Sequence, residues 1–149
     1  MTTDPAPFVG AKGALFLGAS VITIQRDDLP GLRWAGLWDL PGGGREGGET
    51  PVECFLRELS EELTLTLSAD RLLWAAQLPS VLSPSKPAWL FAARLTKGEV
   101  DQIKLGDEGQ GWALMPVSAF LDHPEAIPQM QDRVAMAVRA LGVIGPEIR

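Results

Sequence analysis

Residues 43–65, with the sequence GGREGGETPVECFLRELSEELTL, constrain the fold of this chain more than any other segment. Thr50 is a suitable N-cap, Pro51 suits the first helical turn, and Glu53, three residues after the cap, completes a capping box. The pattern therefore predicts a helix over Pro51–Leu63 that follows a glycine-rich approach.

Three glutamates fall on one face of this predicted helix. Glu61 and Glu62 follow Glu58 by three and four residues, and such positions lie side by side on a helix. The adjacent face is apolar and predicts the core side, with Val52, Phe55, Leu56, Leu59 and Leu63. Like charges at this spacing repel by roughly 0.2–0.5 kcal/mol per pair. The patch is either an ordinary solvated face or a site for a hard divalent cation, which carboxylate oxygens suit as ligands.

A strand-like segment, residues 37–41, leads into the triple glycine at residues 42–44. Glycine lets a backbone approach a ligand closely, so we expect an irregular loop there. Residues 42–47 also fit the G-x-G-x-x-G pattern of a dinucleotide-binding domain. That alternative conflicts with its context, because the helix begins only near Thr50 and its glutamates would repel a bare pyrophosphate.

The segment resembles the signature of the Nudix hydrolases. The family pattern is a glycine, five residues, a glutamate, seven residues, Arg-Glu, an aliphatic residue, any residue, Glu-Glu, any residue, a glycine and an aliphatic residue. The corresponding positions are Gly43, Glu49, Arg57, Glu58, Leu59, Glu61, Glu62, Thr64 and Leu65. Only Thr64 departs from the pattern, where the family has a glycine that commonly ends the helix in a left-handed conformation. Because the acidic positions are kept, we expect an altered helix exit and an intact metal site.

The resemblance, which extends more weakly to MutT-like proteins, implies an α/β fold: the Nudix-type α/β/α sandwich with a mixed β-sheet. It also implies a hydrolase that cleaves the diphosphate linkage of a nucleoside diphosphate derivative with Mg²⁺ or Mn²⁺. Glu58, Glu61 and Glu62 are the expected catalytic residues and metal ligands. The Gly42 carbonyl is expected to be a further ligand.

Further site residues follow from the same resemblance. Glu49 and Arg57 are expected to interact and, with Gly43, to support the site by holding the loop against the helix. Glu108, in a Glu-Gly-Gln loop flanked by two glycines, is a candidate catalytic base, and a solvated acidic loop is the alternative. The choice of proton acceptor between Glu58 and Glu108 stays open. Arg26, at the end of a predicted strand, is a candidate for binding a substrate phosphate or a plain surface residue.

Composition narrows the class of protein. The chain has 149 residues, a formal net charge of −6 and a pI near 4.7. We expect one domain over residues 1–149, with residues 1–7 flexible. An acidic chain is poorly suited to bind a nucleic-acid polymer. The lone cysteine, Cys54, excludes a disulfide framework, and its expected role is that of a small buried residue. With no signal peptide and no apolar run longer than residues 14–24, we expect a cytoplasmic protein without a membrane partner.

The remaining pattern alternates strands and helices. Strands are predicted over residues 9–17, 19–26, 37–40, 71–78, 89–95 and 111–115, and helices over Pro51–Leu63, Val117–Leu121 and residues 129–141.

Substrate identity is only partly constrained. The chain contains no tyrosine, so it lacks the tyrosine marker of diadenosine polyphosphate hydrolases. A nucleoside triphosphate, converted to a monophosphate and pyrophosphate, is the first expectation. The alternatives are an ADP-ribose or nucleotide-sugar pyrophosphatase, and a non-catalytic Nudix-fold regulator that binds a nucleotide. A homodimer is left open.

Overall fold

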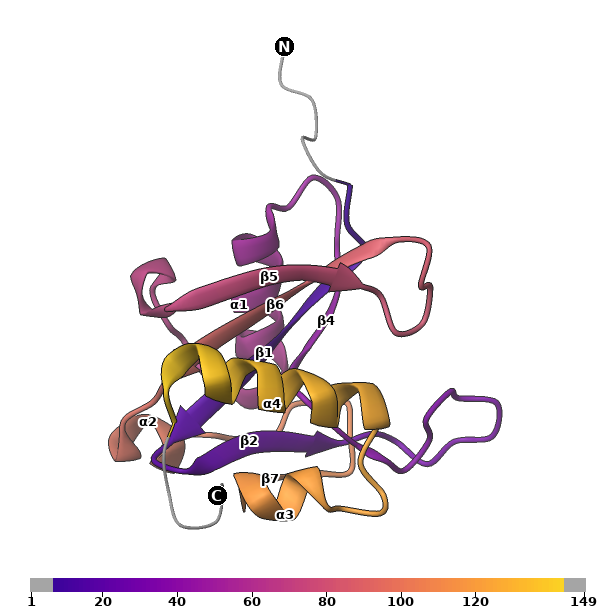
Figure 1. Ribbon diagram of the computed structural model, residues 1–149. Coiled ribbons are helices and arrows are strands. Elements are labelled where there is room, and N and C mark those ends of the chain that lie inside the picture. Colours follow the sequence, from indigo (N-terminus) through magenta and orange to yellow (C-terminus); the bar gives the residue numbers. More distant parts are fainter. Residues whose placement is uncertain (1–6, 144–149) are drawn as a thin grey trace.

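A mixed sheet of seven strands forms the centre of the computed structural model, which describes residues 7–143 (Figure 1). The strands are β1 (Gly10–Leu17), β2 (Ser20–Gln25), β3 (Trp38–Asp39), β4 (Gly42–Gly44), β5 (Trp74–Pro79), β6 (Pro87–Arg94) and β7 (Gly111–Pro116). Their order is β3-β2-β1-β6-β5, with β4 paired to β1 and β7 paired to β2. β1 and β6 run parallel, whereas the other pairings are antiparallel.

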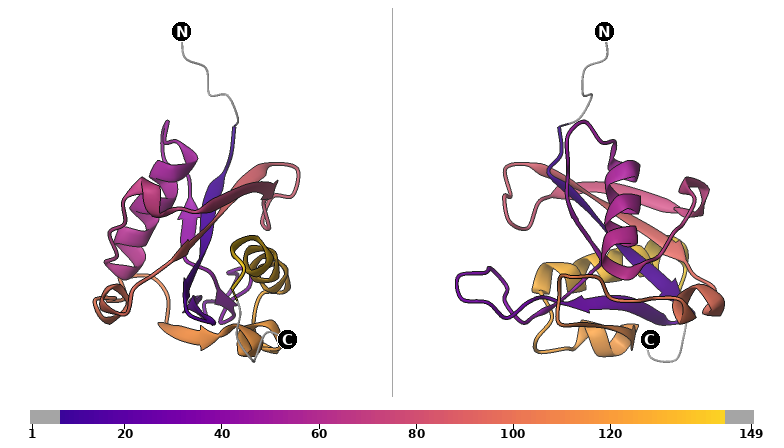
Figure 2. Two further views of the ribbon diagram at one scale, coloured as in Figure 1. Left: turned by 60° about the vertical axis from the view of Figure 1, so that its left-hand side comes forward. Right: turned by 180° about the vertical axis from the view of Figure 1, so that it is seen from behind.

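Helices cover both faces of this sheet. Helix α1 (Pro51–Leu63) lies on one side of β1 and helix α4 (Pro128–Leu141) on the other (Figure 2). The shorter helices are η1 (Ala69–Arg71), α2 (Lys97–Asp101) and α3 (Val117–Leu121). The predicted α/β/α sandwich with a mixed sheet is therefore confirmed.

The central strands supply the two hydrophobic cores from alternate residues. Leu15 and Ile22 pack in the core under α1 with Phe55, whereas Phe16 and Val21 pack in the core under α4. Successive side chains of a strand point to opposite faces, so an uninterrupted apolar run serves both layers. This double burial holds α1, and therefore its glutamates, at a fixed position on the sheet.

Several predicted elements agree closely with the structure. Helices α1 and α3 have the predicted bounds, and α4 begins one residue earlier than expected. Strand β5 starts only at Trp74, because Arg71, the first residue of the predicted strand, instead ends a 3₁₀ turn over residues 69–71.

Two elements differ from the sequence analysis. Residues 42–44 form strand β4, not an irregular loop, because Gly42 and Gly43 pair with Lys12 and Ala11 of β1. Helix α2 has no predicted counterpart, although Thr96 and Glu99 form a capping box at its start.

The predicted flexibility of residues 1–7 falls mostly on residues 1–6, which lie outside the described residues. Of the helices within residues 7–143, none has both the length and the apolar character that a membrane span requires.

Thr64 ends helix α1 in the left-handed region, with φ 55° and ψ 35°. This conformation costs a residue with a Cβ atom roughly 1–2 kcal/mol, while the exposed hydrogen bond from Thr64 Oγ1 to Lys104 O returns part of that cost. We expect Thr64→Gly to raise the free energy of unfolding by about 1 kcal/mol at unchanged turnover. Thr64→Ala is the control: it keeps the strain, loses the hydrogen bond and should destabilise. Urea unfolding of the variants measures both, and a destabilised glycine variant would contradict this account.

Arg71 joins η1, β6 and α2 through a bidentate pair with Glu99 at 2.6 and 2.8 Å and a hydrogen bond to Arg94 O. The Arg71 guanidinium lowers the pKa of Glu99 from 4.5 to about 2. Because the folded pKa is depressed, this stabilisation is present above pH 4.5 and is lost as the pH falls through about 2.

We therefore expect Arg71→Leu to lower the free energy of unfolding by about 1 kcal/mol at pH 7, after allowance for solvent screening, and by less at pH 3. The exposed pair Lys97–Asp101 supplies the control, since Lys97→Leu should change stability by less than about 0.5 kcal/mol. Equal losses at both pH values would disprove the assignment.

Candidate active site

The glycines of strand β4 contact the glutamates of helix α1. The Gly42 N–H donates to Glu62 Oε1 at 2.7 Å. At Gly43 a Cβ atom would lie 2.5 Å from Glu58 Oε2, so a side chain there would displace this carboxylate. Gly42 itself has φ +131°, which favours glycine. These glycines let the two carboxylates approach the sheet backbone.

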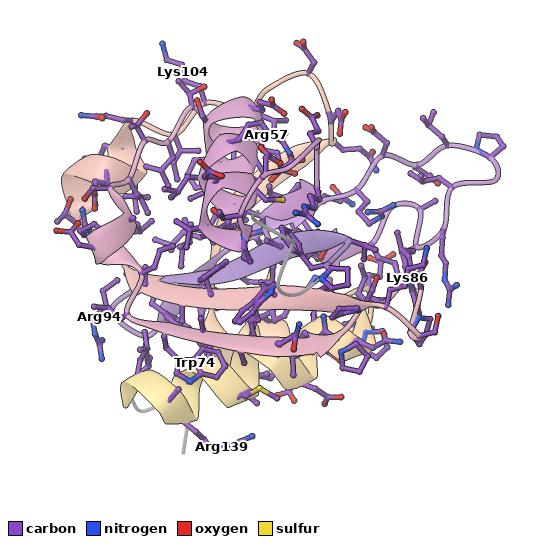
Figure 3. The ribbon with its side chains drawn as sticks, turned by 90° about the horizontal axis from the view of Figure 1, so that it is seen from above. Arg57, Trp74, Lys86, Arg94, Lys104 and Arg139 are labelled. Carbon is purple, nitrogen blue, oxygen red and sulfur yellow. The ribbon has the colours of Figure 1, made fainter. Side chains whose placement is uncertain are left out.

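Arg57 organises the loop that precedes α1. Its Nε and Nη2 donate to the two oxygens of Glu49 at 2.6 and 3.1 Å, and Nη2 also donates to Gly44 O at 2.8 Å. The expected contact between Glu49 and Arg57 is thus present, and it lowers the pKa of Glu49. Nη1 reaches Glu58 at 3.3 Å and Glu61 at 3.0 Å, so one guanidinium orients several carboxylates. Figure 3 shows the position of Arg57 beside helix α1.

The three glutamates of α1 differ in environment. Burial raises the pKa of Glu62 to about 7, against the opposing effects of Lys12 and the Gly42 N–H. Burial also raises the pKa of Glu58, although Arg57 counteracts it. The Glu61 side chain is 57% exposed and turns toward Arg57. Glu58 and Glu62 line the main cavity, whereas Glu61 lines a smaller one together with Glu62.

Within residues 7–143, no three carboxylate, histidine or cysteine side chains form a preassembled metal cluster. In this arrangement Glu61 accepts a hydrogen bond from Arg57, and Glu62 accepts one from the Gly42 N–H. The donor set nevertheless suits Mg²⁺ or Mn²⁺, because Glu58 and Glu62 offer oxygen ligands in one cleft. A bound cation would favour the ionised form of both carboxylates, which burial disfavours.

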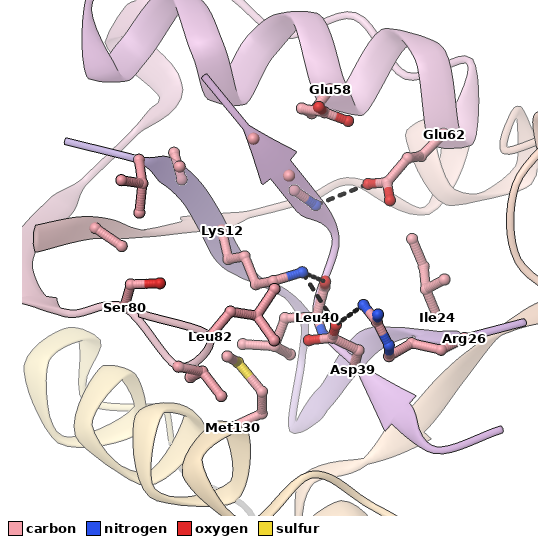
Figure 4. A pocket seen from close by; sticks show the side chains of 18 of the residues that line it. Lys12, Ile24, Arg26, Asp39, Leu40, Glu58, Glu62, Ser80, Leu82 and Met130 are labelled. Carbon is pink, nitrogen blue, oxygen red and sulfur yellow. Dashed lines mark hydrogen bonds and ion pairs between the residues drawn. The ribbon is translucent and has the colours of Figure 1, made fainter. Parts of the chain in front are cut away.

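A cavity of about 650 Å³ opens beside these glutamates (Figure 4). Glu58 and Glu62 line one side, and Lys12 projects into the middle of the cavity. Arg26, the candidate phosphate-binding residue, lies at the opposite wall and ion-pairs with the buried Asp39 at 3.5 Å. The cleft therefore combines an acidic side with a basic one.

Lys12 and Asp39 are site residues that the sequence analysis missed. Lys12 Nζ donates to Asp39 Oδ2 at 3.0 Å and to Leu40 O at 3.2 Å. In the sequence, each is a single charged residue in an otherwise apolar strand segment, and this pattern could have indicated a role in the site. Asp39 is only 3% exposed, and its carboxylate forms ion pairs with both Lys12 and Arg26.

Glu108 lines both the main cavity and a smaller acidic one that it shares with Glu61, Glu62 and Asp107. Its loop is held at both ends, by Gly106 N donating to Glu62 O at 2.7 Å and Gln110 N donating to Gln25 O at 2.9 Å. A Cβ atom at position 106 would collide with Glu61 O, so Gly106 allows the loop to pack closely against helix α1.

The topology excludes the dinucleotide-binding alternative. A G-x-G-x-x-G turn joins a strand to the helix that crosses over to a parallel strand. Here residues 42–44 are themselves a strand antiparallel to β1, and the N-terminus of α1 is capped by its own Thr50 and Glu53.

Fold and site together define an α/β protein with a mixed sheet and a glutamate-bearing helix beside a cleft. The sequence matches the family described as NUDIX domain over residues 8–135. The chain therefore belongs to the Nudix family.

Several known proteins share this similarity. Human 8-oxo-dGDP phosphatase NUDT18 is 32% identical over 108 residues, which cover 69% of this chain and 32% of that protein. The RNA pyrophosphohydrolase of Gluconacetobacter diazotrophicus is 31% identical over 129 residues, with coverage of 71% and 74%. The chain spans about a third of the length of the first curated relatives that it matches.

A solved structure shares the fold. The bifunctional NMN adenylyltransferase/ADP ribose pyrophosphatase of Francisella tularensis, complexed with AMP and a Mn ion, aligns with a TM-score of 0.68 at 17% identity. The alignment covers 91% of this chain and 42% of that one.

Proposed function

We propose that this protein is a Nudix pyrophosphohydrolase that uses a divalent cation to cleave the diphosphate linkage of a nucleoside diphosphate derivative. The observation that carries the proposal is the placement of Glu58 and Glu62 against the glycines of β4 in a cleft that also holds Lys12 and Arg26. Acidic and basic groups in one cleft suit a cation and a polyphosphate together.

Each residue has a distinct part in this proposal. Mg²⁺ or Mn²⁺, held by Glu58, Glu61, Glu62 and the Gly42 carbonyl, would supply phosphoryl polarisation and a more acidic water. Glu108 or Glu58 accepts the proton of the attacking water.

The basic residues act on the substrate and on the loop. Lys12 and Arg26, fixed by Asp39, attract phosphate oxygens and offset the developing charge. Arg57 and Glu49, with Gly43, keep the glycine strand against α1.

A nucleoside triphosphate, cleaved to a monophosphate and pyrophosphate, is our first candidate substrate. The names of the relatives, an 8-oxo-dGDP phosphatase and an RNA pyrophosphohydrolase, support phosphoanhydride chemistry on nucleotides. An ADP-ribose or nucleotide-sugar pyrophosphatase is the main alternative, and a regulator that binds a nucleotide without hydrolysis is the other.

We expect release of pyrophosphate or a nucleoside monophosphate from at least one nucleotide, only when Mg²⁺ or Mn²⁺ is present. The test is a panel of nucleoside triphosphates, 8-oxo-dGDP, ADP-ribose, nucleotide sugars and 5′-triphosphorylated RNA, with phosphate and pyrophosphate measured separately. The RNA tests the expectation that a nucleic-acid polymer is not a partner. Turnover that persists in excess EDTA would refute the proposal, and nucleotide binding without turnover would favour the regulator.

A further inference from the structure

Arg133, on the inner side of α4, is a cation of the cleft to which the proposed function gives no role. Its side chain is half-buried and lines the same cavity as Glu58 and Glu62. Nη2 donates to Pro79 O, and Arg133 makes no other hydrogen bond or ion pair within residues 7–143.

Arg133 differs from the neighbouring cations of the cleft because its guanidinium forms no ion pair within residues 7–143. Lys12 and Arg26 both form ion pairs with Asp39, which Arg133 does not. Burial lowers the pKa of Arg133 because it keeps this charge partly out of water, and the nearby charges of Asp39 and Asp132 only oppose this effect. A neutral donor would satisfy Pro79 O equally well, so the contact alone does not explain an arginine.

The loop that connects β5 to β6 follows Pro79, the hydrogen-bond partner of Arg133, and adds two serine hydroxyls to the lining of the same cavity. Ser80, directly after Pro79, is buried, and its hydroxyl points toward the middle of the cavity (Figure 4). Ser83 lines the cavity as well. Ser80 Oγ accepts the Ser83 N–H at 3.3 Å and donates to no group within residues 7–143, so its proton can be donated to a ligand. Ser80 N donates to Lys86 O and Lys86 N to Ser83 O, both at 2.8 Å, which fixes the loop.

We propose that Arg133, Ser80 and Ser83 form a subsite for a phosphomonoester that the substrate carries in addition to its diphosphate. A guanidinium and two hydroxyl donors match a group with three terminal oxygens. In Figure 4, Ser80 and Glu62 lie on opposite sides of Lys12, so this group is separate from the phosphates at the glutamates. The proposal rests on the proposed function and narrows its substrate to a diphosphate compound with a second phosphorylated position.

The first test measures binding without catalysis. Calorimetry in EDTA at low ionic strength compares 5′-AMP with adenosine for the wild type, Arg133→Gln and Arg139→Gln. Glutamine removes the charge and keeps a polar side chain, and Arg139 is an exposed arginine on the outer side of the same helix (Figure 3). We expect the wild type to bind AMP at least about tenfold more tightly than adenosine. This difference in affinity should disappear in Arg133→Gln, become smaller in Ser83→Ala and stay unchanged in Arg139→Gln. Equal affinities, or a gap that Arg133→Gln retains in folded protein, would overturn the subsite.

The second test concerns the substrate. With Mg²⁺, coenzyme A and dephospho-coenzyme A differ only in the 3′-phosphate, and we expect a kcat/KM ratio of at least about ten that falls to near one in Arg133→Gln. A ratio near one in the wild type, or no turnover of either compound by an enzyme that hydrolyses other nucleotides, overturns the substrate class. Arg133-dependent AMP binding in a protein that hydrolyses no diphosphate compound would refute the proposed function and leave the subsite standing.

Discussion

Glu62→Gln should lower turnover by about a hundredfold or more while the fold stays intact. The loss of one ionised carboxylate removes charge stabilisation of the kind that is commonly worth roughly 2.7–4 kcal/mol in the transition state. Glutamine Oε1 can still accept the Gly42 N–H, so the contact between α1 and β4 survives. Steady-state kinetics with Mg²⁺ measure the loss of turnover, and circular dichroism checks that the fold is intact. Asp101→Asn, an exposed acid on α2, is the control and should leave turnover unchanged.

The same substitution has a pH-dependent effect on stability without metal. The folded pKa of Glu62, about 7, exceeds the usual 4.5. Below pH 4.5 the Glu62 carboxyl is protonated in both the folded and the unfolded state, so it does not lower the free energy of unfolding. As the pH rises from 4.5 through about 7, ionisation favours the unfolded state and stability is lost. In EDTA, we expect Glu62→Gln to be more stable than the wild type by roughly 2–3 kcal/mol at pH 8, with little difference at pH 4. Near-normal turnover, with no stability gain at pH 8, would identify Glu62 as an ordinary surface carboxylate.

Glu108→Gln should lower kcat by roughly 10²–10⁴-fold with metal affinity near that of the wild type. Glu108 lines the cavity beside Glu62, where its carboxylate faces the same space as the other glutamates and can accept the proton of a water bound there. If Glu108 is the base, its variant loses the acidic limb of the pH profile of kcat, whereas Glu58→Gln mainly weakens metal binding.

Asp107→Asn is the matched control for this comparison, because Asp107 borders the smaller acidic cavity and not the main one. Calorimetry with Mg²⁺ separates the metal effect from the proton effect. If the acidic limb disappears in Glu58→Gln and persists in Glu108→Gln, Glu58 is the base and Glu108 only lines the cleft.

The local sequence was sufficient to determine helix α1. The cap at Thr50, the capping box with Glu53 and the periodic apolar face depend on neighbours within the helix, so its predicted bounds agree with the structure. The resemblance to the Nudix signature likewise predicted the contact between Glu49 and Arg57. The left-handed exit at Thr64 followed from a glycine position of the family pattern that this chain fills with a bulkier residue.

Only the tertiary structure decided the basic side of the cleft. Lys12, Asp39 and Arg133 come from β1, β3 and α4, and nothing in the local pattern around any of them indicates the other two. Their proximity depends on strand pairing and helix docking, which are long-range contacts. The orientation of Glu62 has the same origin. Helical spacing places Glu61 and Glu62 each beside Glu58, and Glu61 contacts Arg57 of its own helix, but only the docking of α1 against β4 brings the Gly42 N–H to Glu62.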